Sequence, residues 1–97
     1  MSSGDETELI TTLHPQGKHG VSLPAAKYRL MREAIVSALR QRGPQTWGGL
    51  AERVEHDLAD RFTGSVRWHY TMVKLDLEAR CEITCDRSGK QMVISLP

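Results

Sequence analysis

Apolar residues recur along this chain first with a helical period and then, near its end, with a two-residue period. Residues 24–42 place apolar side chains at spacings of three and four, which predicts an amphipathic helix. These side chains are Tyr28, Met31, Ile35, Ala38 and Leu39. Pro24 suits the first turn of such a helix, and Gly43-Pro44 ends it.

A second amphipathic pattern follows Thr46, a residue suited to N-capping, and extends to Phe62. Its stripe contains Trp47, Leu50, Ala51, Val54, Leu58 and Phe62. Gly48 and Gly49 each weaken a helix by about 1 kcal/mol relative to Ala. The helix therefore begins directly after Thr46, or residues 45–48 form an extended lead-in and it begins later.

Residues 66–80 predict a third helix with apolar side chains on two opposite faces, after Ser65 as N-cap. One face carries Val66, Tyr70, Val73 and Leu77, and the other carries Trp68, Met72, Leu75 and Ala79. Such a helix is expected between two layers. Residues 81–85 and 91–96 then alternate as a β-hairpin. Its inward positions are predicted to be Cys81, Ile83 and Cys85, then Met92, Ile94 and Leu96.

The N-terminal part precedes these helices and is expected to hold an extended arm. Residues 1–8 are polar and predict a flexible tail, and residues 9–13 are suited to an edge strand. Residues 14–20 form a loop, and residues 21–23 lead into the first helix. The sequence thus predicts one α+β domain over residues 9–97, with an arm at 9–23, three helices and a C-terminal hairpin. This is the layout of a winged-helix-like, helix-turn-helix type of domain.

Composition restricts the class of function. Lys plus Arg number 13 and Asp plus Glu number 12, so no global field attracts nucleic acid or an anionic membrane. The sequence contains neither a signal peptide nor an apolar run long enough to span a bilayer, and we expect no membrane partner. Two cysteines, predicted to be packed free thiols, fit a reducing cytoplasm.

Residues 77–83, Leu-Glu-Ala-Arg-Cys-Glu-Ile, are similar to the run that closes the third helix of many winged-helix transcription regulators. That resemblance covers about residues 24–97 and implies a recognition helix at 66–80. A closer resemblance is to a small bacterial family of unknown function. Its motifs are the His-Pro-x-Gly-Lys-x-Gly loop at 14–20, a helix bearing Tyr28, and Trp68 followed by Val-Lys-Leu-Asp-Leu-Glu-Ala-Arg at 73–80. The resemblance implies a shared fold, with Cys81 where both families usually have Gly.

Two binding functions compete for the third helix. Nucleic acid would be contacted by Arg67, Thr71 and Lys74 on one flank and by Arg87 and Lys90 at the wing tip. Against this, the side that would enter a DNA groove carries Trp68, Met72 and Leu75, which instead predict a protein-interaction or homodimer surface. The arm, a second copy or another protein could cover these three side chains. We place nucleic acid slightly ahead because winged helices often bind DNA, an argument from fold alone.

Other chemistry finds little support in the sequence. Lys18 and His19 could contact an anion from the 14–20 loop, although an ordinary connector is the commoner use of such a loop. Cys81 and Cys85 have no Cys-x-x-Cys spacing and no His pair, so no metal site is predicted. No catalytic residue and no cofactor are expected, and the chain is predicted not to be an enzyme.

Overall fold

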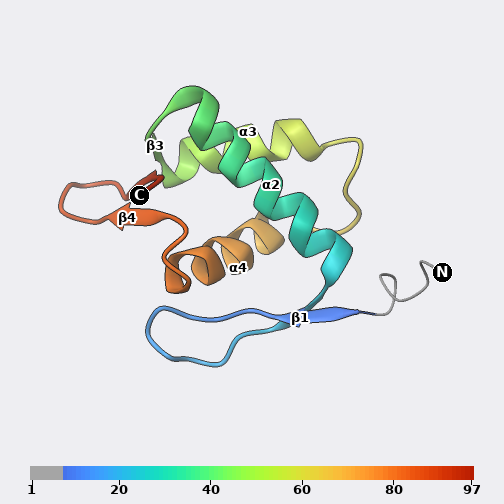
Figure 1. Cartoon of the computed structure of the whole chain (residues 1–97). Coiled ribbons are helices and arrows are strands. Elements are labelled where there is room, and N and C mark those ends of the chain that lie inside the picture. Colours follow the sequence, from blue (N-terminus) through green and yellow to red (C-terminus); the bar gives the residue numbers. More distant parts are fainter. Residues whose placement is uncertain (1–7) are drawn as a thin grey trace.

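The computed structural model describes residues 8–97, which form an α+β domain with a winged-helix-like layout (Figure 1). Its helices are α2 (Ala25–Arg42), α3 (Trp47–Leu58) and α4 (Val66–Ala79). The three helices pack against one another around a common core whose fully buried members include Met31, Val54 and Tyr70. The predicted order of three helices followed by a hairpin is confirmed.

Helices α3 and α4 begin directly after the residues that the sequence predicts as N-caps. The Thr46 hydroxyl accepts a hydrogen bond from Gly49 N–H at 3.1 Å, and the Ser65 hydroxyl accepts one from Trp68 N–H at 3.1 Å. Both residues are therefore N-caps, as predicted. The end of α3 differs, because it stops at Leu58 and not at Phe62. Hydrogen bonds there tighten to the i−3 type, with Arg61 N–H donating to Leu58 O at 3.1 Å.

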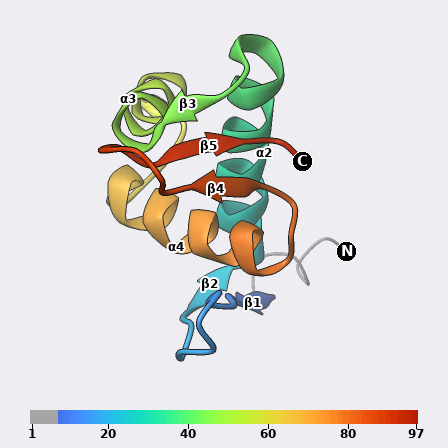
Figure 2. The same ribbon diagram turned by 90° about the vertical axis from the view of Figure 1, so that its left-hand side faces the viewer.

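The wing is a three-stranded antiparallel sheet of order β3-β5-β4. The strands are β3 (Gln45–Thr46), β4 (Thr84–Asp86) and β5 (Val93–Ser95), so the extended lead-in to α3 is itself a strand. Ile94 is fully buried, and Met92 and Leu96 pack against the core, as alternation predicts. Figure 2 shows this sheet beside α4, and Figure 1 shows the β4–β5 turn projecting away from the helices.

The N-terminal arm is a β-hairpin that lies beneath α4 in both ribbon views (Figures 1 and 2). Its strands β1 (Leu9–Thr11) and β2 (Ser22–Pro24) pair antiparallel, with Ile10 opposite Leu23. The expected strand near residue 9 is confirmed, whereas residues 22–24 form a strand that the sequence did not indicate. Leu23 is buried and anchors the arm to the core. Of the predicted tail at 1–8, residues 1–7 lie outside the described part.

The surroundings of α4 differ from the expected sandwich between two layers. Its inner face is buried as predicted, with Tyr70, Val73 and Leu77 all fully inaccessible. The opposite face stays partly open, and Trp68 is 44% exposed. The arm does not cross that face. It binds instead along the flank bearing Asp76, whose carboxylate accepts a hydrogen bond from Leu13 N–H at 2.8 Å.

Candidate functional site

The outer face of α4 carries a line of apolar side chains that the described residues leave partly uncovered. Trp68 is exposed, and Met72, Leu75 and Ala79 are partly buried. Their spacings of four, three and four residues place all four on one side of the helix. We call this set the α4 stripe. The structure thus brings together the three predicted interaction residues and Ala79, which the sequence pattern placed on the same face.

The first two residues predicted to contact nucleic acid lie at the N-terminal half of α4. The Arg67 guanidinium pairs with Glu55 at 2.9 Å and lies over the Trp47 ring, 5.6 Å from its centre. Its hydrogen bond to Glu55 lowers the pKa of that carboxyl. The Thr71 hydroxyl donates to Arg67 O at 2.9 Å. Both polar groups are already used within the protein.

Lys74 does not occupy an open flank of the helix, contrary to the expectation. Its side chain is only 2% exposed, and its ammonium donates to Glu78 at 3.1 Å. Arg87, from the wing, reaches the same carboxylate at 2.9 Å. The hydrogen bond from Arg87, joined by that from Lys74, lowers the pKa of Glu78 to about 2. Burying an unpaired charge is costly, and the pairing with Glu78 is what makes the buried position of Lys74 tolerable.

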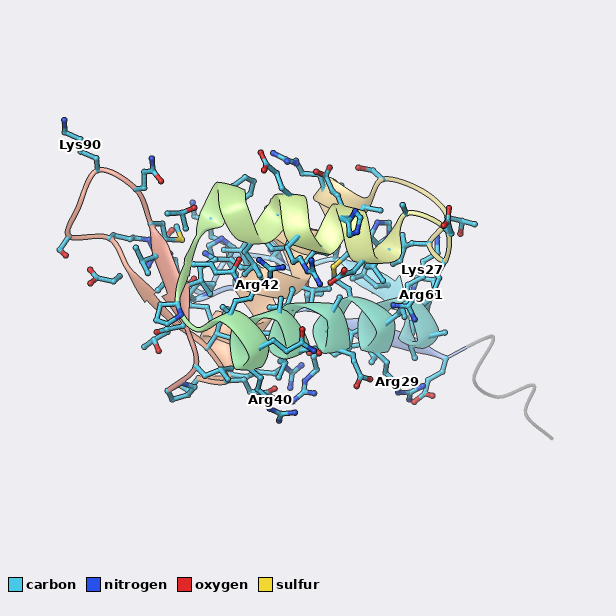
Figure 3. All side chains as sticks on the ribbon, turned by 90° about the horizontal axis from the view of Figure 1, so that it is seen from above. Lys27, Arg29, Arg40, Arg42, Arg61 and Lys90 are labelled. Atoms are coloured by element: carbon cyan, nitrogen blue, oxygen red, sulfur yellow. The ribbon has the colours of Figure 1, made fainter. Side chains whose placement is uncertain are left out.

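Lys90 is the remaining member of the predicted nucleic-acid set, and it lies exposed at the wing tip without an acidic partner in residues 8–97. Figure 3 shows it far from the other labelled cations. Lys27, Arg40, Arg42 and Arg61 also lack an ion pair within the described residues, and they lie on α2 or just after α3. The unpaired positive charge therefore does not gather along α4.

Asp76 forms a buried polar cluster that sequence reasoning missed. It is completely inaccessible, and it accepts hydrogen bonds from the Tyr28 hydroxyl, from Leu13 N–H at 2.8 Å and from Arg80 Nε at 2.9 Å. Burial and the hydrogen bond to Asp76 raise the pKa of Tyr28. An Asp between two leucines and four residues before an Arg was the available signal, because that spacing pairs the two on one flank. The cluster ties the arm, α2 and α4 together.

The loop with the predicted anion contacts lines a cavity of about 630 Å³. Lys18 and His19 lie on its arm side, and Glu78, Ala79 and Cys81 form the facing wall at the end of α4. The sequence suggested the loop but not its partner surface, because residues 14–20 and 78–81 meet only through the docking of the arm on Asp76.

The cysteines differ from the prediction that both are packed. Cys81 is exposed, in the left-handed region at φ 63°, a conformation that favours Gly. It ends α4 in place of starting a strand, because Glu82 N–H donates back to Leu77 O at 2.9 Å. Cys85 is partly buried, and burial raises the pKa of its thiol.

Residues 8–97 contain no cluster of three or more His, Cys, Asp or Glu able to hold a metal ion.

Comparison with known proteins places the chain in a family. A family model described as a family of unknown function, DUF6958, matches residues 9–93. No curated protein matches the chain, and no solved structure matches it either. Within residues 8–97, no helix is both long and apolar enough to cross a membrane. The match covers the arm, all three helices and most of the wing, and the chain therefore belongs to DUF6958, a family of unknown function.

Proposed function

We propose that this chain is a non-enzymatic regulatory module that pairs with a second copy of itself through the α4 stripe. The observation that carries the proposal is the exposure of Trp68. On the same helix face Leu75 is partly exposed, and Met72 is partly exposed while also packing against the core. Large apolar side chains gain about 1.5–3 kcal/mol each on full burial. A contiguous apolar patch of this kind marks a protein interface.

The spacing of the stripe favours a helix as the partner. Residues separated by four, three and four positions follow the d-a-d-a order of a heptad seam, which packs against another helix. A partner surface that is not a helix would not require this spacing of apolar residues. The occupant we infer is therefore α4 of another copy.

The order of side-chain sizes fits an antiparallel pair. A two-fold axis between residues 73 and 74 sets Trp68 opposite Ala79 of the other copy and Met72 opposite Leu75. The largest side chain then faces the smallest, so the two stripes fill each other. A two-fold dimer needs this self-complementarity, because the same patch serves both subunits. With so few residues the interface is small, and we expect dissociation constants of about 10–100 μM.

The test is the solution mass between about 10 μM and 1 mM, a range that brackets the expected affinity. We expect Trp68→Glu to remain monomeric and folded, and Leu9→Glu, which changes an exposed leucine on the arm, to dimerise normally. Ala79→Trp alone should clash with Trp68 of the partner. Adding Trp68→Ala moves the large residue to the other end of the stripe and should restore pairing. A monomeric wild-type chain throughout this range, or a double variant that stays monomeric, contradicts the antiparallel dimer.

Nucleic-acid binding is the second candidate, as in the winged-helix regulators that the α4–wing junction resembles. It is supported by the exposed, unpaired Lys90 at the wing tip, where such domains meet phosphates. Arg67 and Arg87 reduce that support, because carboxylates already neutralise both. Phosphate contacts predict a duplex affinity that falls steeply with salt and weakens in Arg87→Ala/Lys90→Ala. A low-salt gel without any shifted duplex removes this candidate.

The cytoplasm is the location we infer for this module. Both of its cysteines are free thiols, which is the usual state in a reducing compartment. Cys81 is exposed and would be oxidised readily outside such a compartment.

A further inference from the structure

The cavity between the arm loop and the end of α4 is formed by two distant parts of the chain. One wall comes from the loop between Thr12 and Gly20, and the other from Glu78, Ala79 and Cys81. With a volume of about 630 Å³, it has room for a small organic molecule. Trp68, Met72 and Leu75 do not line it, so this site is separate from most of the α4 stripe.

Internal hydrogen bonds hold the loop in one shape. Gly17 N–H donates to His14 O at 2.9 Å, and Val21 N–H donates to the Thr12 hydroxyl at 2.9 Å. Leu13 N–H is held by the buried Asp76. Gly20 allows a very close approach, since a Cβ atom there would lie 1.8 Å from Thr12 O. The wall is thus formed before any ligand arrives, which reduces the entropy cost of binding.

The loop offers several hydrogen-bond donors. Gln16 N–H donates to His14 Nδ1 at 3.1 Å, so in the neutral ring the proton lies on Nε2, which is left as a donor. Within residues 8–97, the backbone N–H groups of Lys18, His19 and Gly20 have no acceptor. The Lys18 ammonium likewise has no acidic partner in that part of the chain. These donors and this cation all belong to the arm wall of the cavity.

The charged side chains that line the cavity are Lys18 and Glu78. Lys74 and Arg87, which do not line it, already pair with Glu78 and offset its negative charge, so the Lys18 ammonium is the charge available to a ligand. The C-terminal end of α4 also points here, and helix carbonyls disfavour anions. That effect is reduced because Arg80, Cys81 and Glu82 N–H groups already bind the last carbonyls. The Lys18 ammonium and the unused N–H donors suit an anion.

We propose that this cavity binds a small phosphate monoester, with its phosphoryl group on the arm wall against Lys18 and His19. A phosphoryl group carries up to two negative charges and three free oxygens, which matches several donors beside a cation. A carboxylate has two oxygens and one charge, so it would accept hydrogen bonds from fewer of these donors. The remaining volume accommodates the organic part of the ester.

The test uses phenyl phosphate as the probe and benzoate as its carboxylate counterpart, titrated by calorimetry at constant ionic strength. We expect saturable binding of phenyl phosphate with a dissociation constant below about 1 mM, and at least about tenfold weaker binding of benzoate. Amide NMR signals of Lys18, His19 and Gly20 should shift during the phenyl phosphate titration. This measurement needs no altered residue.

Lys18→Gln should weaken phenyl phosphate binding about tenfold, whereas Lys90→Gln, which removes an exposed lysine outside the cavity, should leave it unchanged. Failure of wild type to bind phenyl phosphate overturns the proposal, as does equal binding by the Lys18→Gln variant. Equal affinity for benzoate overturns the phosphoryl assignment. Because neither lysine belongs to the α4 stripe, both variants should keep the wild-type solution mass. Ala79 belongs to the stripe and also lines the cavity, so the titration is repeated in the Trp68→Glu variant, and binding of phenyl phosphate there keeps the result separate from that of the dimer test.

Discussion

The Tyr28 hydroxyl on α2 donates a hydrogen bond to the Asp76 carboxylate on α4, and both residues are buried. The same carboxylate accepts Leu13 N–H from the arm. One carboxylate side chain therefore joins three segments that are distant in sequence. The arrangement explains why the arm lies along the Asp76 flank of α4 and leaves Trp68 on the outer face exposed.

Tyr28→Phe should lower the free energy of unfolding by about 1–3 kcal/mol, because it removes a buried hydrogen bond to a charged acceptor. Urea denaturation measures the change. In an Asp76→Asn background the same substitution should cost less, since the charged acceptor is gone, and the double-mutant cycle isolates the pair. Equal costs in the two backgrounds would show that the charge of Asp76 adds nothing to its hydrogen bond with Tyr28.

The geometry of the arm depends on Gly20. Gly20→Ala would place a methyl group 1.8 Å from Thr12 O, a backbone atom that cannot move without shifting β1. We expect detachment of the arm, seen as loss of hydrogen-exchange protection at Thr12 and Leu13 and a fall of about 2 kcal/mol or more in unfolding free energy.

Gly89→Ala is the matched control for the arm, because nothing lies within 4 Å of its added methyl group. It should change the unfolding free energy by less than about 0.5 kcal/mol. If Gly20→Ala destabilises the protein as little as this control does, Gly20 does not lie as close to Thr12 as the structure places it.

The framework of the fold could be predicted from sequence because its signals are local. The apolar period of residues 24–42 and the caps Thr46 and Ser65 are set by neighbours along the chain. The strand at Ser22–Pro24 gave no such signal, since three residues containing a proline show neither alternation nor a run. Its pairing depends on β1, thirteen positions earlier at Leu9.

The candidate sites depend on longer-range contacts and were harder to predict. The spacing of Lys74 and Glu78 suggests an exposed helix pair, but Lys74 is buried, and the exposed Arg87 from the wing pairs with the same carboxylate. Trp68 was placed correctly on the outer face because helical geometry alone determines that side. The wall formed by Glu78 to Cys81 opposite Lys18 required the arm to dock first, which no local pattern encodes.

Cys81 is the residue at which a substitution is expected to stabilise the domain. Its φ of 63° is unfavourable for a residue with a Cβ atom, and glycine accepts it without strain. Cys81→Gly should therefore raise the unfolding free energy by about 0.5–1 kcal/mol in thermal or urea unfolding. Cys81→Ala keeps the Cβ atom and serves as the control. An equal gain in both variants would point to the thiol and not to the backbone.

Glu78 should make stability depend on pH in a defined window. Hydrogen bonds from Arg87 and Lys74 lower the pKa of Glu78 from 4.5 to about 2, so the folded state favours the ionised form. A depressed folded pKa gives stability that is present above the unfolded value and is lost as pH falls towards the folded one. The difference in unfolding free energy between wild type and Glu78→Gln should thus be about 2 kcal/mol above pH 5. It should shrink between pH 4.5 and 2.

The measurement is urea unfolding of both proteins at half-unit steps from pH 2 to pH 7. Glu33→Gln is the matched control, because Glu33 is exposed on α2 and has no basic partner within residues 8–97. Its curve should follow that of wild type. A wild-type advantage over Glu78→Gln that persists unchanged at pH 2 would mean that the carboxylate charge is not what holds Lys74 and Arg87 in place. The buried position of Lys74 would then need another cause, since an ammonium without a counter-charge is unstable at 2% exposure.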